Sequence, residues 1–328
     1  MLVNKFYSLI VILFLLGELF SQENNVKNSV LKDSLIHVIA DGQKGFYHDY
    51  ILFIPKGTVL NKKTYLLVEP NNTGRVSDSI EVHQNHAIHL ASKSSVGNNI
   101  STELKIPLLV PVFPRPASKP DTYTHALDRD VMKEESVDLK RLDLQLIAMI
   151  NDSKVLLKSM KIDVEDKVFM NGFSASGTFT NRFSFIHPEL IQALAIGGFN
   201  GKLMLPVSDL GKVEMNYPLG LNDFEKLFGK KFEMELYREV HQFIYMGKLD
   251  DNDAVRFSDA YSKRERRIIN TNLGDSVQDR FLVCQDFYLN SDLNVVFKSY
   301  EHVGHWTTSS INLEIIKFFY KHLKSLPD

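Results

Sequence analysis

The sequence predicts an α/β fold in which helices cover both faces of a mostly parallel central sheet. Short β-branched and aromatic runs alternate with longer stretches of helical periodicity, the pattern of such a fold. The strand candidates are continuous apolar runs, as expected where helices cover both sheet faces. The chain has 328 residues, an ordinary length for one α/β domain that carries an insertion.

The predicted strands, in chain order, cover residues 35–40, 49–55, 64–68, 106–113, 167–171, 191–196, 242–246 and 293–299. The clearest helix covers residues 137–160, where apolar residues recur at i, i+3 and i+7, and Ser136 is its expected N-cap. Two further helices are predicted over 177–187, ending before Pro188, and over 311–323.

The first residues have the pattern of an export signal. Lys5 supplies a positive charge, residues 9–20 are largely apolar, and a polar run follows. The apolar stretch is shorter than the about 20 residues that a membrane span needs, so cleavage is favoured over a retained anchor. We therefore expect residues 1–22 to be a signal peptide, and residues 23–328 to form a secreted or periplasmic domain with no stable membrane span.

Composition narrows the choice of partners. The formal net charge is −2 with both signs mixed along the chain, so the sequence indicates no basic face for nucleic acid.

The single Cys284 cannot form an intramolecular disulfide. Because it lies in an apolar run, we expect a buried and inert thiol.

The most informative stretch is Asn-Gly-Phe-Ser-Ala-Ser-Gly at residues 171–177, which lies between a predicted strand and a predicted helix. A nucleophilic serine needs a sharp strand-to-helix turn with small neighbours, and the helix N-terminus favours developing negative charge. Ser174 has Gly172 two positions before it, whereas Ser176 has no such glycine. Ser174 is therefore the favoured nucleophile.

With this motif the chain resembles an α/β hydrolase, and within that superfamily the exported esterases and polyhydroxybutyrate-depolymerase-like serine hydrolases. Their elbow reads G-x-S-x-G-G, and Ser176 stands where they usually have glycine. The resemblance implies a triad in the order Ser, Asp, His, with an oxyanion hole of backbone amides and no metal or organic cofactor.

The resemblance assigns the general base to His305. This histidine lies between the last predicted strand and the last predicted helix. It directly follows Gly304, as the base of that group usually does, which selects it over His302.

The acid is expected in the loop that follows the strand at 242–246. The G-x-x-D spacing of the resembled group selects Asp250, with Asp253 as the first alternative and Asp251 as the second. A Ca²⁺ site built from these three carboxylates is a competing interpretation. It is less favoured because the loop lacks the remaining EF-hand pattern.

The oxyanion loop is expected after the strand at 64–68, where this chain has no Gly-rich run. A backbone amide of Asn71 or Asn72 is expected to act together with that of Ala175, the residue after the nucleophile.

Two further groups of polar residues lie near these loops. Three histidines recur every three residues in a predicted helix (His83, His86 and His89), and an exposed helical face is favoured over a metal site. Three others lie beyond the end of the strand at 106–113 (Arg115, His125 and Asp128). The carboxyl edge of such a sheet binds ligands, so they are candidates for the substrate pocket as much as for structural ion pairs.

Together these features predict a serine hydrolase that cleaves a small-molecule or polymeric carboxylic ester through an acyl-enzyme. Residues 198–240 carry mixed turn and helix signals and are expected to form a small cap insertion before the acid-bearing strand. Two other interpretations stay open. One is a serine peptidase of the prolyl-oligopeptidase-like type, and the other is a non-catalytic binding protein with the α/β-hydrolase fold.

Overall fold

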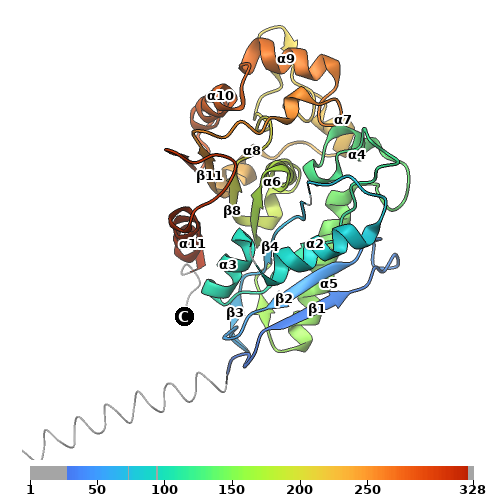
Figure 1. The fold of residues 1–328 in the computed structure, drawn as a ribbon, viewed down its shortest axis with the longest axis vertical. Coiled ribbons are helices and arrows are strands. Elements are labelled where there is room, and N and C mark those ends of the chain that lie inside the picture. Colours follow the sequence, from blue (N-terminus) through green and yellow to red (C-terminus); the bar gives the residue numbers. More distant parts are fainter. Residues whose placement is uncertain (1–27, 73, 94, 324–328) are drawn as a thin grey trace, which may run out of the picture.

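The computed structural model describes residues 28–72, 74–93 and 95–323; the predicted signal peptide lies outside them. The centre of the protein is an eight-stranded sheet in the order β1-β2-β5-β4-β7-β8-β11-β12 (Figure 1). Its strands are β1 (Ser34–Val38), β2 (Tyr50–Ile54), β4 (Leu67–Val68), β5 (Leu108–Pro111), β7 (Val168–Phe173), β8 (Ile191–Gly197), β11 (His241–Gly247) and β12 (Val295–Tyr300). The strands from β5 to β12 run parallel, whereas β1 and β2 pair antiparallel. The predicted fold class is confirmed.

Ten helices flank the sheet within the described residues. They are α2 (Ile80–Ser92), α3 (Val96–Leu104), α4 (Arg129–Lys133), α5 (Leu142–Ser159), α6 (Ala175–Ile186), α7 (Phe224–Phe228), α8 (Met234–Glu239), α9 (Lys263–Leu273), α10 (Val277–Asn290) and α11 (Ser309–Leu323). Three single 3₁₀ turns accompany them: η1 (Thr124–Ala126), η2 (Pro188–Leu190) and η3 (Ala254–Arg256). None of the helices in this part of the chain is long and apolar enough to cross a membrane.

Two separate apolar cores lie on the two faces of the sheet. Successive residues of β2 alternate between them, with Leu52 in the larger core and Ile51 and Phe53 in the smaller one. Helices α5, α6 and α10 contribute to the larger core, and α2, α3 and α11 to the smaller. This alternation is the reason why the strands are continuous apolar runs.

The segment predicted as one strand at 64–68 forms two short strands instead. It is divided into β3 (Lys63–Thr64), which pairs with β6 (Asp163–Val164), and β4, which lies between β5 and β7. The hydrogen-bond partner changes within this segment. The Thr64 carbonyl accepts from the amide of Glu165, and the Leu66 carbonyl accepts from the amide of Phe169.

The predicted helix at 137–160 begins later than expected, at Leu142. Arg141 adopts a left-handed conformation (φ 49°), and its guanidinium donates two hydrogen bonds, of 2.9 and 2.7 Å, to the Asp143 carboxylate. This conformation interrupts the helical path. The predicted N-cap Ser136 instead begins a separate turn, in which its carbonyl accepts from the amides three and four residues later.

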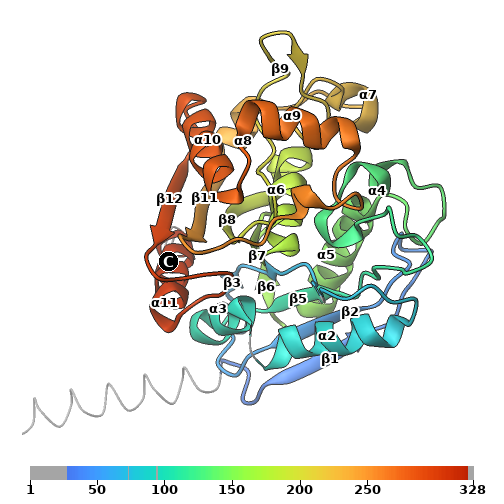
Figure 2. The ribbon, with the colours of Figure 1, turned by 45° about the horizontal axis from the view of Figure 1, so that its top comes forward.

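Residues 198–240 connect β8 to β11, where the insertion was expected. They contain α7, α8 and the hairpin of β9 (Asp209–Leu210) and β10 (Val213–Glu214). Figure 2 shows this hairpin beside α9, at the end of the molecule remote from β1.

Candidate active site

Ser174 occupies a sharp turn between β7 and α6. Its backbone has φ 62° and ψ −127°, a conformation that costs free energy for any residue except glycine. Two backbone hydrogen bonds hold this turn, from the Ser174 amide to the Gly197 carbonyl (3.0 Å) and from the Thr178 amide to the Ser174 carbonyl (3.1 Å). The turn thus presents the Ser174 side chain at the carboxyl edge of the sheet, where it lines a cavity.

The small residues around Ser174 are required by crowding. A Cβ atom at Gly172 would lie 2.2 Å from the carbonyl oxygen of Ser176. At Gly177 it would lie 3.0 Å from the carbonyl oxygen of Gly197 on the neighbouring strand. The turn therefore excludes a side chain at position 172 and tolerates one poorly at 177.

Ser176 has a structural position. Its side chain is buried, and its hydroxyl donates to the Phe173 carbonyl (2.8 Å) and accepts from the Phe173 amide (3.0 Å). These contacts close the turn from inside. They explain how the turn accommodates a serine at position 176, and both hydrogen bonds of its hydroxyl are made to the backbone.

His305 and Asp250 lie side by side at the same edge of the sheet. His305 follows β12 and Asp250 follows β11, two adjacent strands. Nδ1 of His305 is 2.9 Å from Oδ2 and 3.1 Å from Oδ1 of Asp250. Since only 1% of the Asp250 side chain is exposed, this carboxylate is shielded from water and oriented toward the imidazole.

The other acid and base candidates lie elsewhere. The Asp253 carboxylate is buried, pairs with Arg280 (2.5 Å) and accepts from the Val255 amide (3.0 Å). Asp251 and His302 are both exposed.

Sequence reasoning missed one polar residue at this centre, Asn252. Its Nδ2 atom is 3.0 Å from Nε2 of His305 and 3.3 Å from Oγ of Ser174. Its backbone amide donates to Oδ1 of Asp250 (3.0 Å). Asn252 thus contacts all three candidate triad members. An asparagine in a polar loop carries no sequence signal for such a role.

The two candidate oxyanion residues after β4 differ in position. The side chain of Asn71 is buried and bonded to the backbone of Phe113, donating to its carbonyl (2.8 Å) and accepting from its amide (3.1 Å). Asn72 lines the cavity together with Ser174, and its Nδ2 donates to the Phe173 carbonyl (3.4 Å). Ala175 is the first residue of α6.

The cavity beside Ser174 has a volume of about 600 Å³. Besides Ser174, its lining residues are Asn72, Gly74, Val76, Arg115, Pro120, Asp121, Tyr123, Asn200, Asn252, Ala254, Phe257, Ser258 and Asp259. Of the expected cap insertion, residues 198–240, only Asn200 belongs to the wall among the described residues.

Arg115 is the one of the three pocket candidates that lines this cavity. Its guanidinium pairs with Asp259 (2.7 Å) and lies 3.9 Å from the centre of the Tyr123 ring. Arg115, Asp259 and Tyr123 all line the cavity, so Arg115 is both a wall residue and a partner in an ion pair.

His125 and Asp128 are not among the described residues that line this cavity, and both make structural contacts instead. Nε2 of His125 bonds to the Phe113 carbonyl (2.8 Å), and burial lowers the pKa of His125 to about 3. Asp128 accepts from the amides of Val131 (3.0 Å) and Tyr123 (3.1 Å), and burial raises its pKa to about 7. Both side chains hold the loops behind the cavity wall.

The three histidines of α2 do not form an exposed face. His83 is fully buried, 2.9 Å from the Ser77 carbonyl, whereas His89 is exposed. Burial lowers the pKa of His86 to about 4. Among the residues that the structure describes, no group of three or more His, Cys, Asp or Glu side chains is arranged to hold a metal ion.

Comparisons with known proteins find similarity at the level of structure. No family model matches the chain, and no curated protein matches it in sequence. The poly(aspartic acid) hydrolase-1 from Sphingomonas sp. KT-1 superposes with a TM-score of 0.56 at 13% identity, covering 90% of this chain and 100% of that one. An S-formylglutathione hydrolase from Agrobacterium tumefaciens gives a TM-score of 0.50 at 12% identity, covering 90% and 95%. The chain has the α/β-hydrolase fold.

Proposed function

We propose that this protein is a serine hydrolase that cleaves carboxylic esters through an acyl-enzyme, with Ser174 as nucleophile, His305 as base and Asp250 as acid. The observation that carries the proposal is the 2.9 Å contact between His305 and a buried Asp250, beside a serine held in a strained turn. Acyl transfer requires a nucleophilic serine and an oriented histidine, and here the side-chain amide of Asn252 contacts both Ser174 and His305.

The geometry supports the following steps. Nε2 of His305 removes the hydroxyl proton of Ser174 as Oγ attacks the ester carbonyl, while Asp250 stabilises the imidazolium through Nδ1. Backbone amides of Ala175 and Asn72 hold the oxyanion. The alcohol leaves with the proton from His305. Water then attacks the acyl-enzyme with His305 again as base, which releases the acid and restores Ser174.

In the resting structure Nε2 of His305 accepts a hydrogen bond from Asn252. The same lone pair must accept the Ser174 proton before attack. Asn252 therefore has to yield this position when substrate enters. The polar wall that includes Asn252, Asn72 and Arg115 indicates a substrate with hydrogen-bonding groups around the scissile bond.

The names of the two structural neighbours refer to poly(aspartic acid) and to S-formylglutathione. We therefore propose a test panel of p-nitrophenyl esters, an S-acyl thioester, a polyester and aminoacyl anilides. Hydrolysis of the esters with inert anilides supports the proposal. Preferred cleavage of anilides would identify a peptidase, and a protein inert on the whole panel would contradict the proposed hydrolase.

The nucleophile is tested with a fluorophosphonate probe. Ser174→Ala should abolish labelling and ester hydrolysis. Ser176→Ala is the matched control and should retain both, because its hydroxyl is bonded to the backbone of the turn. A label located on Ser176 by mass spectrometry would contradict the assignment.

We also propose that residues 1–22 direct export and are then removed. The support is the positive Lys5, the short apolar run and the polar run that follows. N-terminal sequencing of the exported protein should give a start near Ser21 to Glu23. Exported material that still begins at Met1 would refute cleavage.

A further inference from the structure

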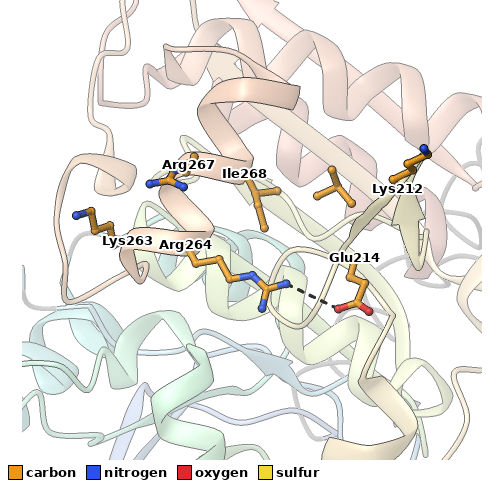
Figure 3. Close-up of a pocket in the computed structure, with 7 residues that line it drawn as sticks. Lys212, Glu214, Lys263, Arg264, Arg267 and Ile268 are labelled. Atoms are coloured by element: carbon orange, nitrogen blue, oxygen red, sulfur yellow. Dashed lines mark ion pairs between the residues drawn. The ribbon is translucent and has the colours of Figure 1, made fainter.

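A second cavity lies outside the candidate active site, in a groove between the β9–β10 hairpin and α9. Its volume is about 860 Å³. The hairpin contributes Lys212, Val213 and Glu214, and the first turns of α9 contribute Lys263, Arg264, Arg267 and Ile268. Figure 3 shows these side chains around the groove.

The groove carries an excess of positive charge. Four of its side chains are cationic and one, Glu214, is anionic. Glu214 pairs loosely with Arg264 at 3.8 Å, and both side chains are mostly exposed. Within the part of the chain that the structure describes, Lys212, Lys263 and Arg267 have no ion-pair partner. These three cations are available to an anionic ligand.

The rest of the lining narrows the chemistry of that ligand. Val213 and Ile268 place apolar surface between the cations, and the seven lining residues include no aromatic ring and no amide side chain. An acidic sugar polymer would find no aromatic ring in this groove on which to stack. A peptide rich in Asp or Glu would set its carboxylates against the cations and its methylene groups against the apolar side chains.

The position of the groove places it next to the candidate active site. Asp259 lines the cavity of Ser174, and Lys263 lines the groove four residues later. Because an extended chain spans at most about 3.5 Å per residue, their Cα atoms are no more than about 14 Å apart. Between them Tyr261 is buried and accepts a hydrogen bond from Arg182 (2.9 Å), which anchors the connection.

We propose that this groove is a docking site for an acidic polypeptide segment of a partner protein. Opposite charge across an interface selects the partner and accelerates its association. Lys212 from the hairpin and Lys263 and Arg267 from α9 contact the carboxylates of the segment. The proposal does not depend on the chemistry at Ser174.

The test measures binding of a fluorescein-labelled poly(L-glutamate) peptide to the full chain by fluorescence anisotropy at low salt. The host carries Ser174→Ala, so turnover cannot affect the result. Reversing three charges together, with Lys212→Glu, Lys263→Glu and Arg267→Glu, should weaken binding by about tenfold or more. Added salt should weaken binding in the host, since the contacts are exposed.

A matched control separates the groove from net charge. It carries Lys32→Glu, Lys56→Glu and Lys93→Glu, three exposed lysines next to β1, β2 and α2 in the sequence that do not line the groove. Its affinity should stay within about twofold of the host. Circular dichroism verifies that both variants fold, and the single changes Lys212→Glu and Arg267→Glu replace the triple change if it does not.

Three results would overturn the proposal. The first is an equal loss of affinity in the groove and control variants, which would indicate a general charge effect. The second is tighter binding of polygalacturonate than of poly(L-glutamate), and the third is tighter binding of phosphatidylglycerol vesicles. Because binding is measured without turnover, failure of ester hydrolysis in the parent protein leaves this result unaffected.

Discussion

At the scale of single residues, the side-chain amide of Asn252 decides which hydrogen bonds the nucleophile and the base can make. It lies 3.0 Å from Nε2 of His305 and 3.3 Å from Oγ of Ser174. A neutral amide in this place donates to an unprotonated imidazole, which is the form required of a general base. A carboxylate in the same place would instead favour the imidazolium.

Asn252→Asp should therefore move the acid limb of the pH profile of kcat/KM to higher pH by about one unit or more, because an opposite charge within hydrogen-bond reach favours the protonated imidazole. The measurement uses a p-nitrophenyl ester. Asn252→Ala is the control: it introduces no charge, so its acid limb should move by less than that of the aspartate variant. An unchanged limb in the aspartate variant would show that Asn252 does not contact His305 in solution.

The two buried carboxylates of the loop after β11, Asp250 and Asp253, are expected to affect different properties: Asp250 the turnover and Asp253 the stability. Asp250→Asn should reduce turnover by about 10³ to 10⁴ while the free energy of unfolding changes little, because the carboxylate orients the base. Asp253→Asn should lower the free energy of unfolding by about 3 kcal/mol, because it leaves the buried Arg280 without its counter-ion. Turnover and urea denaturation of both variants test this contrast, and exchanged effects would reassign the acid.

The loop after β11 that carries Asp250 and Asp253 shows what a sequence pattern can predict and what it cannot. The G-x-x-D spacing selects Asp250, and the structure places Asp250 against His305. The same spacing cannot tell that Asp253 turns away to Arg280, since Arg280 lies on α10, distant in sequence. The contacts of Asn252 depend likewise on the path of the loop.

At the scale of elements, a buried carboxyl group joins the loop after β4 to α3. Glu69 is buried and accepts from the Ser95 hydroxyl (3.1 Å), and a Cβ atom on Gly97 would lie 1.7 Å from its Oε2. The carboxyl group is therefore packed against the first turn of α3. Burial raises the pKa of Glu69 to about 7.

This raised pKa makes stability depend on pH. Between its unfolded pKa near 4.5 and its folded pKa of about 7, the native state binds the Glu69 proton more tightly than the unfolded state does. The stabilisation is present below pH 4.5 and is lost as pH rises to about 7. Glu69→Gln cannot titrate, so its free energy of unfolding relative to wild type should rise by roughly 1–3 kcal/mol from pH 4.5 to pH 8. Urea denaturation at both pH values tests this, and a constant difference would contradict it.

The elements differ in how well their patterns predict them. The strands β2, β7, β8 and β11 are buried apolar runs, and their predicted ranges match closely because both of their faces are covered. No helix is predicted at α9, because Ile269 and Leu273 are its only buried residues and two apolar positions are too few to give a recognisable pattern. The later start of α5 depends on the left-handed conformation of Arg141, which a periodicity count does not detect.

At the scale of the whole molecule, the fold class is predictable and the charge distribution is not. A net charge of −2 with mixed signs gives no sign of a basic groove. The cations of the groove come from Lys212 and from residues 263–267, about 50 residues apart, and only the packing of α9 against the hairpin brings them together. A cluster of charges that depends on long-range packing therefore cannot be predicted from local sequence patterns.

One buried guanidinium connects three distant parts of the molecule. Arg182 lies on α6, the helix behind the nucleophile, and is 1% exposed. It donates to the carbonyl of Ala126 in η1 (2.9 Å) and to the hydroxyl of Tyr261 (2.9 Å). Its contacts thus tie the nucleophile helix to the loop beneath the cavity wall and to the connection that leads into α9.

Arg182→Met keeps most of the buried volume but leaves the Ala126 carbonyl and the Tyr261 hydroxyl without this donor. Each unsatisfied buried group costs about 1–3 kcal/mol, so the free energy of unfolding should fall by roughly 2–5 kcal/mol. Because Tyr261 follows the cavity-lining residues 257–259, fluorophosphonate labelling of Ser174 should also slow under conditions where the variant is folded. Arg264→Met, on an arginine that is 71% exposed, is the control and should change the free energy of unfolding by less than about 0.5 kcal/mol. Equal stability of the two variants in urea denaturation would show that the Arg182 contacts do not hold these three segments together.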